Sequence, residues 1–371
     1  GQNDEEGIQS AVSTAFTTAI VSGLILMCLG VAAAKPILTI MGTPDDVLPL
    51  AATYLRIYFL GIPFFLIFNF GAAILRSMGD TKRPLYILVI AGIINTLLNL
   101  FFVIALKLSV AGVAVATGIA NMVSALLIIR LLCKEKAPFK LHLNKIGVAW
   151  SELRRMLIIG IPAGLQGMVF SFSNVLLQTA INGYGSDAIA GSAAALNFEY
   201  YCYFVISAFN GAAISFIGQN YGAGNKERVR RIYWICLTLS VVCCGALNEL
   251  FVWQRHFFLS FFSNDPNVQT YGATRMGIVL AWQFIASSYE ISASSLRGMG
   301  RSMLPTILTV FGTCLLRIVW VYVVCPIWHT YDVIMLVYPV SWCITGIMVC
   351  TAFYLFARKK LYIEAATGHK L

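Results

Sequence analysis

Residues 75–84 read Leu-Arg-Ser-Met-Gly-Asp-Thr-Lys-Arg-Pro, and residues 296–305 read Leu-Arg-Gly-Met-Gly-Arg-Ser-Met-Leu-Pro. The two copies lie 221 positions apart, and each joins two long apolar runs. The same offset aligns residues 45–84 with residues 266–305 without a gap. Repeats at this spacing are too long for solenoid units and are typical of the two halves of a membrane protein. We therefore predict a duplicated architecture.

The composition excludes a soluble globular protein. Hydrophobic residues make up 59% and charged residues 11% of the 371 positions, and the mean hydropathy is +0.79. Soluble domains carry about 25% charged residues. Several apolar runs exceed the roughly 18 residues that cross a bilayer core of about 30 Å. We expect an all-α polytopic membrane protein with two pseudo-symmetric helical lobes.

The apolar runs predict ten membrane-spanning helices in this chain. They are expected at residues 9–34, 47–75, 84–106, 109–132, 153–182, 187–217, 229–252, 268–296, 303–326 and 332–357. A charged segment with one proline separates the two repeats. The predicted domains are therefore an amino-terminal lobe of four helices at 1–134, a cytoplasmic linker at 135–152 and a carboxyl-terminal lobe of six helices at 153–371.

The second half contains a helix pair, 153–182 and 187–217, that has no counterpart in the first half. If the halves were once equal, the amino-terminal lobe is incomplete and the parent protein has twelve helices, six in each parallel repeat. Two absent helices would open that lobe to lipid. We therefore expect residues 1–371 by themselves to be inactive as a transporter.

The basic residues are distributed unevenly between alternate loops. One side of the predicted topology collects 20 Lys and Arg, whereas the other has only Lys35, Lys107 and Arg255. By the positive-inside rule this bias places both ends of the chain in the cytoplasm, in a multi-pass protein of the cell (inner) membrane. The net charge of +10 is then a topology signal, and it predicts no nucleic-acid partner.

The sequence has no pattern that predicts a metal centre or an enzyme. Nine of the ten cysteines lie in apolar segments, there is no C-x-x-C pair, and the four histidines are scattered. Buried cysteines of this kind act as small hydrophobes in helix packing. The chain also lacks H-E-x-x-H, P-loop and G-x-S-x-G motifs. We expect no metal site, no catalytic residue and no cofactor.

Taken together, the motifs resemble those of the multidrug and toxic compound extrusion (MATE) family along the whole chain. The matching stretches are the two repeats, Gly160–Gln166, Gly218–Gly224 and Tyr338–Trp342. The resemblance implies two six-helix lobes around a central cavity and alternating access between the two sides of the membrane. It also implies export of organic cations or drugs in exchange for H⁺ or Na⁺. We expect a monomer whose partners are these small molecules and the lipid bilayer.

Two acids within the predicted spans are the main candidates for binding a coupling ion or substrate. Glu290 aligns with Asn69 at the 221-residue offset, so the lobes place a carboxylate and an amide at equivalent positions. Glu199 has aromatic neighbours that suit flat cations. Charged groups in membrane spans are usually retained for function. The structural alternatives are a static ion pair for Glu290 and an aromatic packing seam for Glu199.

Arg317, near the middle of its predicted span, requires an anionic or carbonyl partner. We expect it to neutralise Glu290 or Glu199, either as a fixed ion pair or as one that protonation releases. Gln166, which ends the Gly160–Gln166 motif, is a further candidate for binding. A third acid, Glu249, lies close to the outer end of its span and is interpreted as structural.

Asn95 and Asn99 are one helical turn apart and share a face, and Thr117 lies on the following helix. In many MATE relatives the second of these positions is an aspartate that contributes to an ion site, so its replacement by Asn99 departs from the family pattern. The three residues are candidates for binding. The structural alternative is a set of interhelical amide hydrogen bonds.

A lipid flippase and a membrane anchor or channel subunit are the alternatives to a cation exporter. A flippase for lipids or lipid-linked precursors handles anionic head groups, so we expect several Arg or Lys in its cavity. The basic residues within the spans are Arg56, Arg275 and Arg317, against three acids, and this balance mildly favours cations. A membrane anchor or channel subunit has no need to retain embedded acids.

Overall fold

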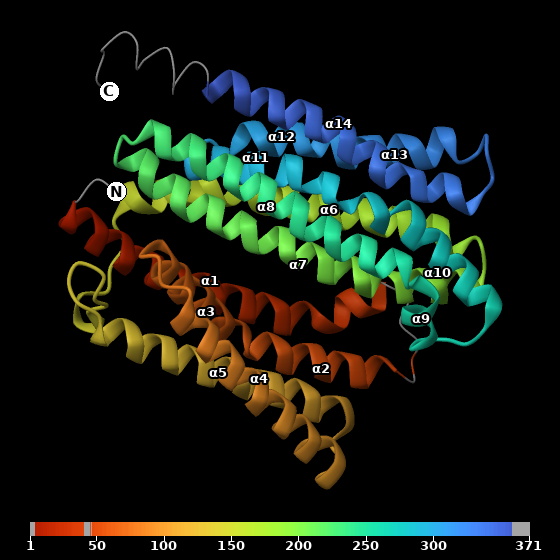
Figure 1. The fold of residues 1–371 in the computed structure, drawn as a ribbon. Coiled ribbons are helices and arrows are strands. Elements are labelled where there is room, and N and C mark those ends of the chain that lie inside the picture. Colours follow the sequence, from red (N-terminus) through yellow and green to blue (C-terminus); the bar gives the residue numbers. More distant parts are fainter. Residues whose placement is uncertain (1–3, 41–44, 46, 358–371) are drawn as a thin grey trace. The chain divides into compact units, whose positions relative to one another are not determined.

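The computed structural model describes residues 4–40, 45 and 47–357 and is shown in Figure 1. Within these residues the chain is helical and contains no strand. The predictions that rest on residues 1–3 and on the basic residues Arg358, Lys359, Lys360 and Lys370 lie outside the described residues.

Eight helices of the described chain are long and apolar enough to cross a membrane. They are α1(Glu5–Ile40), α4(Lys82–Leu100) with its π-helical end Phe101–Ala105, α5(Ser109–Lys134), α6(Trp150–Asn182), α7(Ser186–Gly222), α8(Lys226–Trp253), the continuous run Met303–Val324, and α14(Tyr331–Ala357). The run Met303–Val324 contains α12(Met303–Thr309) and α13(Leu316–Val319), which are joined by the π-helix η4(Val310–Leu315). It ends in a second π-helix, η5(Trp320–Val324). The protein is a polytopic α-helical membrane protein, as the sequence predicted.

The predicted span 47–75 is bent. It forms α2(Leu48–Leu60) and α3(Ile62–Ser77), whose axes differ by 41°. Pro63 lies in the first turn of α3, where a missing backbone N–H breaks no intrahelical bond. At the bend, a Cβ added to Gly61 would lie 3.3 Å from the Cα of Gly118, so the bend also admits a close helix contact. The pair provides a ninth span when taken as one.

The predicted span 268–296 is not one continuous helix. It comprises α10(Pro266–Ile278), the 3-10 helix η3(Leu280–Ile285) and α11(Ala286–Gly298). None of these helices is both long and apolar enough to count among the eight membrane-spanning helices of the described chain. The reason lies in its polarity. Helix α11 carries one glutamate and four buried serines (Ser287, Ser292, Ser294 and Ser295). These groups are buried against protein rather than exposed to hydrocarbon, as with Ser287, which accepts a hydrogen bond from Ser240 of α8 at 2.9 Å.

The repeated motif forms the same turn in both copies. Gly79 and Gly300 have φ angles of +87° and +79°, a conformation that L-residues with a Cβ rarely adopt. The Asp80 N–H donates to the Leu75 carbonyl at 3.1 Å, and the Arg301 N–H donates to the Leu296 carbonyl at 2.8 Å. Each glycine therefore closes a Schellman motif at the end of a helix. The duplication seen in the sequence is a duplication of structure at this point.

The chain divides into two compact units at Met156/Leu157, inside α6. In the first unit, α1, α3 and α5 bury a core that includes Phe16, Leu75 and Ile128. The segment 135–152, expected to be a cytoplasmic linker, packs against this unit. The Leu141 side chain joins the core, and its N–H donates to the Leu132 carbonyl at 3.0 Å. The boundary between units therefore lies after this segment.

The second unit, from Leu157 onward, contains α6 to α14, with the short helix α9(Arg255–Ser260) between α8 and α10. Its core includes Leu177, Met276, Leu280 and Met335. Helices α7 and α10 approach closely, because a Cβ added to Gly191 would lie 2.4 Å from the Val268 carbonyl oxygen. Small residues permit this kind of approach in membrane proteins. The contact brings the polar side chains of α10 against those of α7.

Candidate functional site

The second unit contains a cavity of about 480 Å³. It is lined by side chains from α6, α7, α10, η3, α11, α13 and α14. This volume lies within the range of about 300–1,000 Å³ that is usual for small-molecule sites. Four of the predicted site residues line it: Glu199, Glu290, Arg317 and Gln166.

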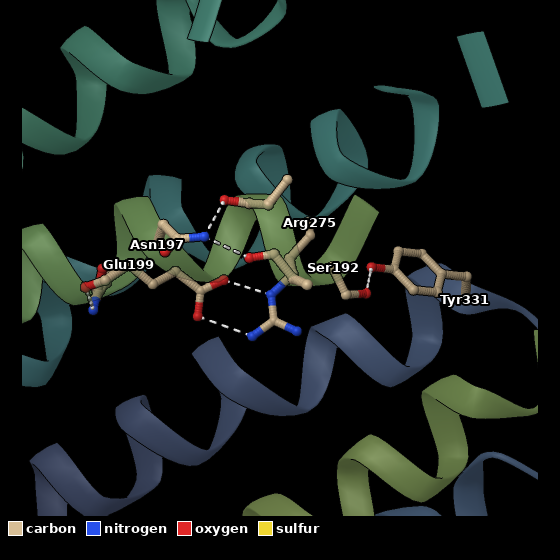
Figure 2. A network of polar contacts seen from close by, with 8 residues as sticks. Ser192, Asn197, Glu199, Arg275 and Tyr331 are labelled. Carbon is tan, nitrogen blue, oxygen red and sulfur yellow. Dashed lines mark hydrogen bonds and ion pairs between the residues drawn. The ribbon is translucent and has the colours of Figure 1, made fainter. Parts of the chain in front are cut away.

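Glu199 on α7 forms a two-bond ion pair with Arg275 on α10, as Figure 2 shows. Arg275 Nε donates to Oε1 at 2.5 Å and Nη2 donates to Oε2 at 3.0 Å. Both side chains are buried. Gln283 Nε2 donates to the Glu199 backbone carbonyl at 2.9 Å and so fixes this part of α7 against η3. A second link in Figure 2 joins the hydroxyls of Ser192 and Tyr331 at 2.6 Å.

Glu290 on α11 is buried and faces the same cavity without an ion pair. Its Oε2 accepts a hydrogen bond from Asn210 Nδ2 at 2.9 Å. No Lys or Arg among the described residues lies within 4.0 Å of its carboxylate oxygens. Arg297, the basic residue two turns further along α11, contributes only at longer range. Glu290 is therefore a buried carboxyl group held by an amide.

The expected ion pair between Arg317 and one of the two acids is not present. Arg317 Nη1 donates to Asn174 Oδ1 at 2.9 Å, and the guanidinium lies 4.6 Å from the Tyr338 ring centroid. The prediction is wrong because Arg275 already occupies Glu199 and Asn210 holds Glu290. Arg317 is 3% exposed, and its buried Nε has no hydrogen-bond partner in the part of the chain that the structure describes.

Arg297 belongs to the second copy of the repeated motif, just after the predicted span 268–296, and it lies at the end of α11 and lines the cavity. Its Nη2 donates to Gln166 Oε1 at 2.5 Å, and its Nε has no partner. The contact gives the predicted candidate Gln166 a defined role, which is to hold this guanidinium against α6. Arg297 and Gln166 lie 131 positions apart in the sequence.

Aromatic side chains form much of the remaining wall. They are Phe170, Tyr200, Tyr203, Tyr289, Tyr338 and Trp342. Tyr338 lies beside two arginines, because Arg275 and Arg317 lie 5.4 and 4.6 Å from its ring centroid. Such contacts stabilise a buried cation by about 0.5–2 kcal/mol. The cavity is thus suited to a flat organic molecule that carries charged groups.

The other predicted candidates lie in the first unit. Asn95 Nδ2 donates to Thr117 Oγ1 at 3.3 Å, and Asn99 Nδ2 donates to Asn95 Oδ1 at 3.0 Å. The first bond links α4 to α5, as the structural alternative anticipated, and the second lies within α4. The buried Oδ1 of Asn99 has no hydrogen-bond partner among the described residues. The half-buried Asn69 donates to the Phe65 carbonyl of its own helix at 2.8 Å.

Sequence reasoning missed several polar residues of the site, among them two arginines and two asparagines. Arg275 and Arg297 were known only as basic residues, and Asn174 and Asn210 were not singled out. The seven-residue spacing of Glu290 and Arg297, two turns on one helix face, could have indicated that Arg297 faces the cavity. The two asparagines carry no such signal, because their partners lie 143 and 80 positions away.

Comparisons with known proteins agree with this architecture. A sequence model of the family described as MatE matches residues 1–101 and 162–323, more than half of the chain. The chain is 26% identical over 321 residues to the probable multidrug resistance protein YoeA of Bacillus subtilis (strain 168), covering 84% of the chain and 69% of that relative. It is 27% identical over 292 residues to an FAD transporter of Shewanella oneidensis, covering 73% of the chain and 63% of that relative.

Among solved structures, the fold is similar to the crystal structure of MATE in the bent conformation. The TM-score is 0.85 at 20% sequence identity, over 99% of the chain and 81% of that structure. This likeness concerns the fold. The chain spans less than two thirds of the Shewanella relative and about two thirds of the Bacillus relative.

Proposed function

The chain belongs to the MatE family, a family of membrane transporters, and from this membership and the cavity we propose that it exports organic solutes by secondary active transport. The proposed solutes are drugs and other aromatic molecules, organic cations among them, and the proposed driving force is exchange for H⁺ or Na⁺. Alternating access of the cavity to the two sides of the membrane is part of this proposal. Its relatives are described as a probable multidrug resistance protein and an FAD transporter, and both descriptions support export of such molecules.

The observation that carries the proposal is the state of Glu290. Its carboxyl group is buried in the cavity, has one amide donor, and lacks an ion-pair partner among the described residues. An uncompensated buried charge is costly, so a proton or Na⁺ that binds there stabilises the site. A solute that changes the polarity of the cavity then alters how readily this ion binds. We propose Glu290 as the coupling residue for this reason.

Glu199 has a different environment, and we propose a different role for it. Arg275 satisfies its charge through two hydrogen bonds, so it positions α10 and forms part of the solute-binding wall. We further propose that Asn95, Asn99 and Thr117 form a secondary polar site in the first unit, with Asn69 near the same lobe's surface. The proposed organisation is two lobes in a monomer of the cell membrane, with both ends in the cytoplasm.

A flippase for lipids or lipid-linked precursors remains the second candidate, and one observation favours it. Three arginines line the cavity, namely Arg275, Arg297 and Arg317, against two glutamates. The sequence had suggested near balance, with Arg56 as a cavity residue, but Arg56 is exposed and lies in the first unit. A cavity rich in arginine suits anionic groups.

The test measures accumulation of two fluorescent compounds in efflux-deficient bacteria that express the complete reading frame of the protein. Ethidium is a cation, and a fluoroquinolone is an aromatic zwitterion. Export predicts that the wild type lowers accumulation of at least one compound and that Glu290→Gln restores it. Glu249→Gln is the matched control, because Glu249 is exposed on α8 outside the cavity. Unchanged accumulation of both compounds despite confirmed membrane expression would overturn the proposal.

A further inference from the structure

The charges of the cavity do not balance. Two acidic and three basic side chains line it: Glu199, Glu290, Arg275, Arg297 and Arg317. Arg275 and Glu199 neutralise each other through their two hydrogen bonds. With one carboxylate and two guanidinium groups left, the cavity has one positive charge in excess. The excess rises to two positive charges when Glu290 is protonated.

Arg317 is the more deeply buried of the two remaining arginines, 3% exposed where Arg297 is half-buried. A guanidinium has five N–H donors, and the only hydrogen bond of Arg317 among the described residues is the one from Nη1 to Asn174 Oδ1. Its Nε is buried and has no partner, and no described carboxylate lies within 4.0 Å. The Tyr338 and Phe170 rings, 4.6 and 5.8 Å from the guanidinium carbon, compensate part of its charge. A buried arginine in this state has donors free for an anion.

The surroundings of Arg317 suit an anion that is attached to a flat ring. Phe170 and Tyr338 lie beside the guanidinium, and Tyr289 and Trp342 belong to the same cavity wall. The cavity volume of about 480 Å³ suits a solute with fused rings. Arginine binds phosphate and carboxylate groups through parallel N–H···O bonds, which are stronger than neutral hydrogen bonds.

We propose that this cavity takes an aromatic solute that bears a phosphate or carboxylate group, and that Arg317 binds that acidic group. The inference rests on the proposed export function and narrows its substrates to aromatic anions and zwitterions. Simple aromatic cations lack the group that Arg317 requires. The acidic group can belong to a soluble molecule or to a lipid head group, and the experiment separates these two sources.

The experiment compares riboflavin with riboflavin 5′-phosphate, two fluorescent molecules that share one ring system and differ by one phosphate. Binding to the purified chain in uncharged detergent is followed by fluorescence anisotropy. A charge-assisted hydrogen bond contributes about 1.5–3 kcal/mol, which corresponds to about a 10- to 150-fold preference for the phosphate ester. Arg317→Gln is expected to abolish this preference, so that the variant binds the two flavins with equal affinity.

Arg301→Gln is the matched control, because Arg301 is exposed and does not line the cavity. This variant is expected to keep the full preference. If Arg317→Gln fails to fold, Arg317→Lys takes its place and is expected to retain only part of the preference, because lysine lacks the paired donors. Equal binding of the two flavins to the wild type, or equal preferences in the Arg317 and Arg301 variants, would overturn the proposal.

A competition arm identifies the source of the acidic group. Phosphatidylglycerol or phosphatidylcholine is added to the micelles, and displacement of riboflavin 5′-phosphate is measured. Displacement by phosphatidylglycerol but not by phosphatidylcholine supports binding at Arg317 and assigns the acidic group to a lipid head group. No displacement by either lipid supports binding of a soluble anion. If the phosphate preference is absent but Glu290-dependent export persists in cells, only the substrate class is wrong and the export function stands.

Discussion

Arg275 of α10 and Glu199 of α7 are joined by two hydrogen bonds of 2.5 and 3.0 Å, although they lie 76 positions apart in the sequence. This ion pair gives one of the two embedded acids a fixed partner. It also leaves Arg317 without a carboxylate partner among the described residues and Glu290 with an amide. The division of roles that we propose for the cavity, one acid structural and one available for coupling, rests on this pairing.

The first prediction concerns the stability of this ion pair. Arg275→Gln should destabilise the protein by about 3–5 kcal/mol, because it leaves the Glu199 carboxylate buried and unpaired. The double variant Glu199→Gln/Arg275→Gln should recover part of this loss, since neither side chain is then charged. Melting temperatures of the wild type, both single variants and the double variant in detergent form the test. Strictly additive effects would show that the two residues do not interact.

The second prediction concerns the repeated turn. Gly300→Ala should destabilise the protein by about 1–2 kcal/mol, because alanine at a φ of +79° places its Cβ against the following carbonyl. Gly164→Ala is the control, since it lies within α6 and a Cβ there would meet no atom within 4 Å. Thermal unfolding in detergent measures both. A melting temperature of Gly300→Ala equal to or above that of Gly164→Ala would contradict the assigned turn.

The third prediction concerns pH and the turn after α3. Burial raises the pKa of the Asp80 carboxyl group. Hydrogen bonds from the Arg83 side chain and from the backbone N–H groups of Lys82 and Arg83 together lower it by more, so the net pKa lies below its ordinary value. The folded pKa is below the unfolded one, so the stabilisation is complete above the unfolded pKa of about 3.9 and is lost as pH falls through the folded pKa.

The variant Asp80→Asn isolates this effect. Wild type should be more stable than the variant at pH 7, by less than about 1 kcal/mol because solvent screens the pair. The difference should shrink when both proteins are measured at pH 3.5 and below. Melting temperatures at the two pH values test it, and a difference that grows on acidification would contradict the sign.

Much of the fold was predictable, because hydrocarbon requires long apolar runs and the chain supplies them. The segment 266–298 was harder, since the sequence shows its polarity but not the partners that allow its polar side chains to be buried. The serines of α11 are satisfied by contacts such as Ser240–Ser287, between positions far apart in the sequence. Similarly, the segment 135–152 was predicted as a cytoplasmic linker from its charge, but Leu141 inserts into a core that sequence alone does not reveal.

The site was predictable as a set of embedded charges but not as a set of pairs. Glu199, Glu290 and Arg317 do line one cavity. Which acid meets which arginine depends on how α7, α10 and α13 are rotated about their axes, and the sequence does not determine those rotations. Glu199 pairs with Arg275, and for that reason the predicted ion pair between Arg317 and one of the two acids was wrong.

The most direct test of coupling at Glu290 uses protein from the complete reading frame in proteoliposomes. The vesicles are loaded with whichever fluorescent compound the protein exports in cells, and release is timed with and without an opposing H⁺ or Na⁺ gradient. We predict that one of these gradients accelerates release by wild type and by Glu249→Gln. Glu290→Gln should still bind the compound, but its release should not respond to either gradient. A gradient response in Glu290→Gln equal to that of wild type would contradict the role assigned to this carboxyl group.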